Sequence, residues 1–458
     1  MTEVSVASPP RVCVIGAGTS GLVAAKALQE RGIEFECFDA SDRVGGLWVF
    51  KNKNGRSGAY RSLHINTSRD RMQFRDFPMP RSYPDYPHRE LIASYLASYA
   101  EHFELTRHIH FETPVTRVTP GTRGGYDVSA GGKVTNFTAV VVANGHHWSP
   151  RMPDPMPEGE FTGLELHSHH YVDPTEPHDL RGKRVVVVGF GNSAVDIACE
   201  LGRDTHGGEV FLSVRRGAWV LPKYALGRPL DQLGVAPPLV PRALRQALVE
   251  LWYRIAVGDP TRFGLPVPDH RLGDAHPTVS SELLTQIGSG AVRPKPAIVR
   301  RDGKRVTFSD GTTEMVDAIV YGTGYHVSFP FFEPSFLSAP NNEFPLYFRI
   351  FHPRAPGVYF IGLCQPLGPI MPIAEAQAKL VAAHVAGDYA LPGATLMENL
   401  TRRERERLRA RFGDSPRHTM QLDFDEYLAA LAGEAASGQK RAALARHRSA
   451  AKVGPSRA

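Results

Sequence analysis

The chain has 458 residues, of which 42% are hydrophobic and 22% are charged, and its net charge is +6. A chain of this length is too long to fold around a single hydrophobic core, so we expect two or three domains. The mild basic excess suits an anionic cofactor, an anionic surface or nucleic acid, without choosing among them. No apolar run approaches the ~18 residues that span a bilayer, and the first ten residues lack the pattern of a signal peptide. We therefore expect a cytoplasmic protein.

Residues 11–41, RVCVIGAGTSGLVAAKALQERGIEFECFDAS, are typical of a dinucleotide-binding strand–turn–helix–strand unit. Gly16 permits the tight turn, Gly18 lets the backbone approach a pyrophosphate, and Gly21 lets helix and strand pack closely. The start of the helix offers free N–H groups to the phosphates. Asp39 ends the second strand, where its carboxylate can accept hydrogen bonds from an adenosine ribose.

A second unit follows at residues 183–216, with VVVV as its first strand and AVDIACEL as its helix. Gly189, Gly191 and Ala194 make the turn GxGxxA. The next strand, VFLSV, ends in Arg215 and Arg216 rather than in an acid. Guanidinium groups can bind a 2′-phosphate that a carboxylate would repel, so this unit is predicted to bind NADPH.

Further apolar strands that end in glycine turns are expected within 137–145 and 316–324, and a last strand within 356–364. Residues 371–387, MPIAEAQAKLVAAHVAG, are predicted to form a helix with a proline in its first turn. Two dinucleotide units in one chain indicate a flavoprotein that a nicotinamide reduces.

The predicted fold class is α/β, with two Rossmann-like domains. We place the FAD domain at 10–172 and 331–437, and the NADPH domain between its two parts at 173–330. The NADPH domain carries a helical insertion at 217–300, and 438–458 is expected to be a basic, disordered tail.

Within the insertion, ALRQALVELWYRIAV at 243–257 is predicted to be an amphipathic helix. We favour a helical cap packed on the two domains. A substrate tunnel or contact with a membrane surface is the alternative, and a homodimer is also left open.

The spaced residues Phe161, Gly163, His167 and Tyr171 fit the pattern FxGxxxHxxx(Y/F). With this fingerprint the chain resembles the flavin-containing monooxygenases over about residues 10 to 432. His167 is expected to help fix the linker that positions NADP⁺ over the flavin.

Other segments match the same family in the same order. IVYGTGY at 319–325 resembles the family's FATGY, with Tyr321 and Gly322 in place of Phe and Ala. Residues 62–80 resemble the segment that carries an active-site asparagine, which falls on Asn66. The matched motifs imply a set of cofactor-binding residues: Gly16, Gly18, Ser20, Gly21, Asp39, Gly46, Leu47, Trp48, Asn66, Gly189, Gly191, Asn192, Ser193, Arg215, Arg216 and Gln365.

The resemblance implies an oxygenation cycle with FAD and NADPH as cofactors. NADPH reduces FAD, dioxygen adds at flavin C4a, and the hydroperoxide passes one oxygen to an amine, hydroxylamine or sulfide. The implied partners are a small nucleophilic substrate and O₂, without nucleic acid. Asn66 is the catalytic candidate, because its amide donates and accepts hydrogen bonds without a titrating proton.

Baeyer–Villiger oxidation of ketones is the nearest alternative, although the dedicated enzymes carry tryptophan where this fingerprint has Tyr171. An NADPH oxidase that releases peroxide, or a non-catalytic NADP(H)-binding redox sensor, also stays open. A disulfide reductase needs a cysteine pair near the flavin, but the chain's cysteines are scattered: Cys13, Cys37, Cys199 and Cys364.

Three histidines, His167, His169 and His170, crowd one short stretch. We expect no metal site there, because a metal needs convergent ligands with supporting acids. The pattern gives no account of His169 and His170.

Overall fold

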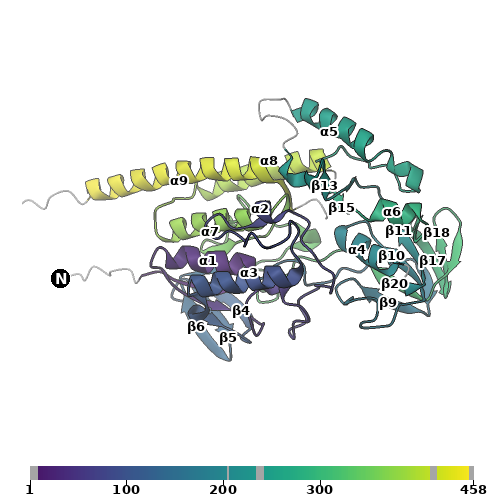
Figure 1. Ribbon diagram of the computed structural model, residues 1–458. Coiled ribbons are helices and arrows are strands. Elements are labelled where there is room, and N and C mark those ends of the chain that lie inside the picture. The colour runs from purple at the N-terminus through teal and green to yellow at the C-terminus, as the bar shows by residue number, and fades with distance from the viewer. Residues whose placement is uncertain (1–8, 204–205, 234–241, 413–419, 453–458) are drawn as a thin grey trace, which may run out of the picture.

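The computed structural model describes residues 9–203, 206–233, 242–412 and 420–452. Two parallel sheets lie side by side, each covered by helices (Figure 1). They form the two α/β domains that the sequence predicts.

The FAD-domain sheet has the strand order β21-β7-β1-β2-β3, and all its pairs are parallel. Its strands are β1 (Arg11–Ile15), β2 (Glu34–Phe38), β3 (Ile109–His110), β7 (Ala139–Val142) and β21 (Val358–Phe360). Helices α1 (Thr19–Gln29), α3 (Arg89–His102) and α7 (Met371–Val385) pack with it. An antiparallel sheet of β4 (Val115–Pro120), β5 (Tyr126–Ala130) and β6 (Lys133–Phe137) adjoins these elements.

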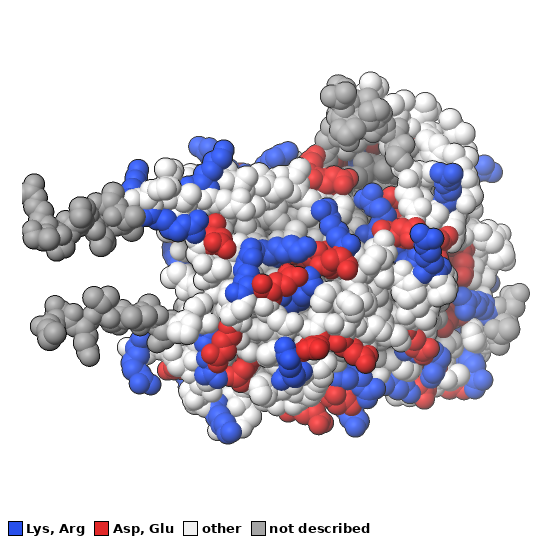
Figure 2. Space-filling view, turned by 60° about the vertical axis from the view of Figure 1, so that its left-hand side comes forward, with Lys and Arg blue, Asp and Glu red and all other residues white. Residues whose placement is uncertain are grey.

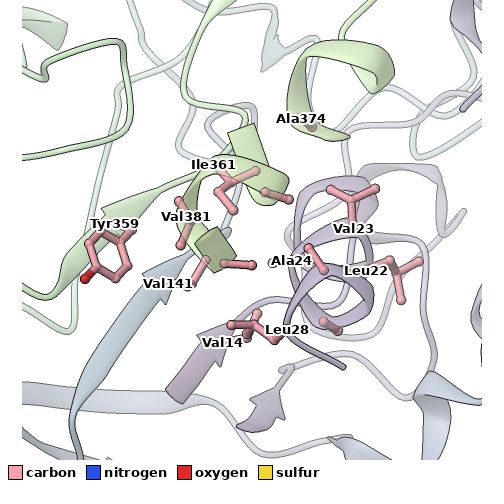
Figure 3. Close-up of a cluster of buried hydrophobic side chains, with 14 of the residues drawn as sticks. Val14, Leu22, Val23, Ala24, Leu28, Val141, Tyr359, Ile361, Ala374 and Val381 are labelled. Carbon is pink, nitrogen blue, oxygen red and sulfur yellow. The ribbon is translucent and has the colours of Figure 1, made fainter. Parts of the chain in front are cut away.

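The core of this domain combines aliphatic side chains from the sheet and from α1 and α7 with buried aromatic rings such as Tyr95 and Tyr99 of α3. Val14 of β1 and Leu22 of α1 are both fully buried, and they belong to one cluster with Val141 and Val381 (Figure 3). Close packing of α1 and α7 on the strands fixes the position of the first glycine turn.

The NADPH-domain sheet has the order β16-β11-β10-β20-β9, again with parallel pairs. Its strands are β9 (Leu164–His167), β10 (Arg184–Val188), β11 (Glu209–Ser213), β16 (Val292–Lys295) and β20 (Ala318–Tyr321). Helices α4 (Asn192–Leu201) and α6 (Leu283–Gly288) pack with it. A second sheet joins β8 (Glu158–Phe161), β17 (Ile298–Gly303), β18 (Arg305–Phe308) and β19 (Thr313–Met315). The predicted strands and helices of both units are thus confirmed.

Strand pairing puts the fingerprint segment with the second unit. β9 pairs with β20, and β8 pairs with β17, so residues 158–167 belong to the NADPH-domain sheets. The predicted domain boundary at residue 172, which assigns this segment to the FAD domain, is therefore too late in the chain. The sequence pattern does not reveal the difference, because an edge strand looks the same whichever sheet it joins.

Two chain crossings connect the domains and lie antiparallel to each other. Pro150 on the first crossing bridges Tyr325 on the second. The backbone N–H of Arg151 donates to the carbonyl of Gly324 at 2.9 Å, and the side chain of Asn144 donates to the carbonyl of Ser328 at 3.0 Å. These bonds hold the two crossings together as one hinge segment.

The insertion within 217–300 contains short strands as well as helices. Its described elements up to residue 279 are β12 (Val220–Leu221), β13 (Tyr224–Ala225), β14 (Arg228–Pro229), η4 (Leu230–Gln232), α5 (Arg242–Ala256), η5 (Pro260–Phe263) and β15 (Thr278–Val279). The predicted end of the insertion at residue 300 is too late, because α6, β16 and the start of β17 belong to the NADPH domain. The predicted helix is therefore confirmed as α5, which lies at the periphery in Figure 1. Tyr253 of α5 is buried, whereas Leu244, Leu251 and Ile255 are exposed. Nothing in the described part of the chain covers this apolar face.

The C-terminal region corrects one expectation. Helix α8 (Ala394–Phe412) and β23 (Gln421–Asp423) precede α9 (Phe424–Lys452), so residues 438–452 are helical rather than disordered. Gly438 lies against the ring of Tyr389, Arg441 donates to the carbonyl of Ala390 at 2.9 Å, and Ala442 is buried. These long-range contacts order a segment whose composition alone favours disorder. Residues 453–458 lie outside the described range.

Across the described residues, no helix combines the length and hydropathy needed to cross a bilayer. On the face drawn in Figure 2, acidic and basic side chains are interspersed. The net positive charge is not gathered into one patch on that face.

Candidate cofactor and active site

The first glycine turn is shaped by close backbone approaches. Gly16 has φ +105°, and a Cβ there would lie 2.6 Å from the carbonyl oxygen of Ala143. A Cβ at Gly21 would lie 1.7 Å from the carbonyl oxygen of Gly16. Gly18 is the N-cap of α1, and no side chain caps this helix start. The turn therefore leaves helix N–H groups available for a phosphate.

Asp39 lies at the end of β2, next to this turn. Its carboxylate accepts hydrogen bonds from the backbone N–H groups of Ala17 and Ser41. Burial raises the pKa of Asp39, and these two N–H donors oppose that rise. The carboxylate keeps lone pairs that can accept from ribose hydroxyl groups.

The remaining residues predicted to bind FAD gather around the same turn. A short 3₁₀ helix, η1 (Gly46–Trp48), comes so close that a Cβ at Gly46 would lie 3.1 Å from the Cα of Gly18. The carbonyl of Leu47 accepts from the Ser57 hydroxyl at 2.6 Å. Ser20 faces Gly362, where a Cβ would lie 2.1 Å from the serine oxygen.

The second turn follows β10 and repeats this design. Gly189 has φ +125°, and a Cβ there would lie 2.5 Å from the carbonyl oxygen of Gly322. Gly191 is the N-cap of α4, again without a side-chain cap, and a Cβ at this position would have no atom within 4 Å. The side-chain oxygen of Asn192 accepts from the N–H of Val279 at 2.8 Å. The space beside Gly191 is where a diphosphate would approach the helix start.

Each turn pairs one glycine with one alanine where the helix meets the end of a strand, but the two residue types are on opposite sides in the two turns. In the first turn, Gly21 faces the side chain of Ala143; in the second, Ala194 faces Gly322. A Cβ at Gly322 would lie 2.6 Å from the Cβ of Ala194. Gly322 stands where the family has an alanine, and the methyl group of Ala194 fills the space that an alanine side chain at 322 would need.

The structure separates the two arginines that follow β11. Arg216 pairs with Asp269 of the insertion at 2.7 Å, whereas Arg215 is exposed and has no ion pair among the described residues. Burial lowers the pKa of Arg151, and the charge of nearby Arg215 lowers it further. Arg151 is held by two bonds from its guanidinium to the carbonyl of Thr323, at 2.9 and 3.2 Å. Arg151 thus adds a cation that the motif does not contain.

Asn66 lies partly buried in the loop before α2 (Arg69–Met72). Its amide has no hydrogen-bond partner among the described residues, so both functions of the amide are free. The insertion holds this loop: Asp231 accepts from the N–H of Ser68 at 2.6 Å, and Gln232 donates to the Ser68 hydroxyl at 3.1 Å. The predicted catalytic residue therefore depends on the insertion for its position.

The fingerprint residues lie along one strap beside the NADPH-domain sheet. The ring of Phe161 folds over Gly163, where a Cβ would lie 2.5 Å from it. His167 ends β9, and its Nδ1 accepts from the N–H of His169 at 3.0 Å. Tyr171 is buried and donates to Glu200 of α4 at 2.8 Å. The strap therefore links β9 to α4.

Histidines and one tyrosine fill the junction between the domains. Tyr325 contacts the rings of His147, His167 and His169, with centroids 5.4 to 5.7 Å apart. Burial lowers the pKa values of His147 and His167 to about 4. With pKa values this low both rings are neutral at pH 7, so they add no charge to the junction between the domains. Gln365 of β22 (Gln365–Leu367) reaches the ring of His147 at 3.4 Å.

The structure shows a contact of His169 that the sequence pattern does not predict. Its Nε2 lies 2.9 Å from the carbonyl oxygen of Gly55, in the FAD domain. His170 is exposed. In the described part of the chain, no three histidine, cysteine, aspartate or glutamate side chains are arranged to hold a metal ion.

Comparison with known proteins identifies the family. A family model described as Flavin-binding monooxygenase-like matches residues 9–444. The chain belongs to this family. It is therefore a flavin-dependent monooxygenase, an oxidoreductase with FAD and NADPH as cofactors.

Individual members of the flavin-binding monooxygenase-like family cover nearly the whole chain. Flavin-containing monooxygenase 5 of Homo sapiens is 36% identical over 443 residues, which are 92% of this chain and 82% of the relative. Dimethylaniline monooxygenase [N-oxide-forming] 2 of Rattus norvegicus is 35% identical over 451 residues, covering 93% and 82%.

Solved structures share the fold. S-allyl-L-cysteine S-oxygenase from Allium sativum superposes with a TM-score of 0.70 at 25% identity, over 93% of this chain and 89% of the other. Cyclohexanone monooxygenase gives a TM-score of 0.69 at 18% identity, over 94% and 98%. The latter likeness concerns the fold alone.

The residues of both turns fit the two cofactors. Each turn offers an uncapped helix start, a glycine without room for a side chain, and an adjacent strand end. Buried Asp39 suits the ribose of FAD, and the cations after β11 suit the extra phosphate of NADPH. Two observations support this fit: the free N–H groups at the helix starts, and the close backbone contacts that only glycine allows in the turns.

Proposed function

We propose that this monooxygenase oxygenates a soft nitrogen or sulfur nucleophile, such as an amine, a hydroxylamine or a sulfide. One observation carries the proposal: relatives about 35% identical to nearly the whole chain are named for N-oxide formation. The structural neighbour at 25% identity is an S-oxygenase. Tyr171, rather than the tryptophan of dedicated Baeyer–Villiger enzymes, points the same way.

Bound FAD and NADPH supply the reducing equivalents and the activation of dioxygen. The protein's own residues bind, orient and exclude water. The two helix starts would hold the diphosphates of the cofactors, and the neutral rings around Tyr325 add no titrating charge to the junction at pH 7. Asn66 offers a donor and an acceptor to the reacting groups.

We also propose a cytoplasmic location. The four unpaired, buried thiols support it, because reduced cysteines are usual in that compartment. Fractionation of the producing cell would test this proposal, and recovery of the protein in an oxidising compartment would contradict it.

The test is NADPH consumption with a panel of amines, sulfides and ketones, in which product and hydrogen peroxide are both quantified. We expect amines or sulfides to give product close to the NADPH consumed. Lactones or esters from ketones alone would replace the proposal with Baeyer–Villiger oxidation. Peroxide equal to NADPH with every substrate would identify an oxidase instead.

A further inference from the structure

Helix α4 carries two carboxylates one turn apart, Asp196 and Glu200, and each accepts a hydrogen bond from a buried tyrosine. Tyr60, from a loop of the FAD domain, donates to Asp196. Tyr171, from the fingerprint strap, donates to Glu200 at 2.8 Å. The helix that holds the NADPH phosphates is thus fastened to two other segments.

A third segment meets the same place. Lys223 of the insertion is partly buried, and its carbonyl accepts from the hydroxyl of Tyr86 in the FAD domain. Its ammonium lies 5.0 Å from the centre of the Tyr86 ring. The charged groups that act on Asp196 are therefore Lys223, which favours the carboxylate, and Glu200 and Glu282, which oppose it.

We infer that Tyr60 and Asp196 form a positioning link, which holds α4 and the NADP(H) bound at its start in register with the FAD domain. Asp196 lies five residues beyond Gly191, about 7.5 Å along the helix axis. A displacement of α4 at Asp196 therefore also displaces the glycine turn at the start of the helix. Hydride transfer requires close and oriented groups, and small displacements weaken it. The inference rests on the NADPH assignment of α4 and not on the identity of the substrate.

The link has a pH dependence with a defined sign. Burial raises the pKa of Asp196 from its ordinary value to about 6, and the hydroxyl of Tyr60 opposes that rise. Above this pH the carboxylate is ionised and accepts a charge-assisted bond from Tyr60. As pH falls through the raised pKa, Asp196 becomes protonated and the bond to Tyr60 weakens.

The raised pKa of Asp196 also affects the free energy of unfolding. Because folding raises the pKa of Asp196, ionisation of this carboxyl costs stability as pH rises between the unfolded and folded pKa values. Asp196→Asn keeps an oxygen that can accept from Tyr60 and removes the charge. We expect its Tm at about pH 8 to exceed that of the wild type.

The first experiment uses the FAD-loaded holoenzyme with Tyr60→Phe. NADP⁺ is titrated by its perturbation of the flavin absorbance, and FAD content is measured in parallel. We expect the Kd for NADP⁺ to rise about fivefold or more, the usual range for coupled sites, with FAD content unchanged. Tyr126→Phe is the matched control, since this buried tyrosine loses a 2.8 Å bond to Pro356 within the FAD domain. An unchanged Kd in Tyr60→Phe would overturn the inference.

The second experiment compares wild type with Asp196→Asn as pH is lowered from about 7 to about 5. The ligand's 2′-phosphate titrates in the same range, so the difference between the two proteins is the readout. We expect the wild type to lose more affinity for NADP⁺ than Asp196→Asn loses. In the Tyr60→Phe background the link is already absent, so we expect Asp196→Asn to change the affinity for NADP⁺ little there.

Identical pH profiles for wild type and Asp196→Asn, or a wild type that gains relative affinity at low pH, would refute the link. If Tyr60→Phe does not retain FAD, these profiles decide the matter alone. None of these readouts requires turnover of a substrate.

Discussion

Tyr321, at the end of β20, shows how one residue that departs from the family is accommodated. Its hydroxyl donates to Glu165, which also pairs with Arg301 at 2.8 Å. Tyr321 is fully buried, and an unpaired buried hydroxyl would cost about 1–3 kcal/mol. The polar atom added in place of phenylalanine is therefore satisfied by a local network.

At the same scale, Asn66→Ala should lose product while FAD remains bound. The free amide is the group assigned to the reacting centre, and loss of one such donor typically costs about 10²-fold in turnover. Product formation and FAD content are measured together. Asn136→Ala, an exposed change on β6, serves as the control. Product formation at the wild-type rate in Asn66→Ala would remove Asn66 from the mechanism.

The two arginines after β11 should contribute unequally to NADPH binding. Arg215→Ala removes a cation that has no ion pair among the described residues. The lost charge-assisted bond to the cofactor, about 1.5–3 kcal/mol, should weaken NADPH binding by about tenfold to a hundredfold. Arg216→Ala should cost less, because Asp269 already pairs with that guanidinium. KM values for NADPH and NADH are compared in both variants. A larger effect of Arg216→Ala on NADPH, or equal effects on NADPH and NADH, would contradict the assignment.

At the scale of elements, α9 is held by a contact that composition does not reveal. Glycine inside a helix normally destabilises it. Gly438 is nevertheless buried, and a Cβ there would lie 2.0 Å from the ring of Tyr389. Helix α9 therefore uses this glycine to bring the segment after 437 against the FAD domain.

Two glycines of α9 give a matched pair of variants. Gly433→Ala should stabilise the protein by about 0.5–1 kcal/mol, because nothing lies within 4 Å of the new methyl group. Gly438→Ala should destabilise it by about 1–3 kcal/mol, because the ring of Tyr389 must move. Denaturant unfolding of both variants tests the pair. Equal stabilisation by both changes would show that the Gly438 contact is absent in solution.

At the scale of the whole molecule, the four cysteines are dispersed and buried. Burial raises the pKa values of all four thiols, to about 12 for Cys199 and Cys364. The thiolate is the reactive form of cysteine. Burial therefore protects these residues in two ways, because it blocks reagents and keeps the thiols protonated.

The native protein should therefore react slowly with an aromatic disulfide reagent, whereas the unfolded chain should show four reactive thiols. Absorbance of the released thiolate measures both states. Rapid reaction of two thiols in the native state would reopen a thiol redox role.

The two glycine turns, their strands and helices, and hence the α/β class and the family, can be predicted from the order of the residues alone. These features follow from apolar runs and glycine spacing within about 30 residues of each other. The FAD turn, with Gly16, Gly21 and Asp39, lies where this local pattern predicts. The cofactor roles of the individual residues stay predictions.

Contacts between side chains that lie far apart in the chain are visible only in the folded protein. Arg216 pairs with Asp269, 53 residues away; His169 reaches Gly55, 114 residues away; and Tyr60 bonds Asp196, 136 residues away. Spacing along the sequence carries no record of such pairs, because they depend on how whole elements pack. For the same reason β9 joined the NADPH sheet and α9 continued through residues that looked disordered.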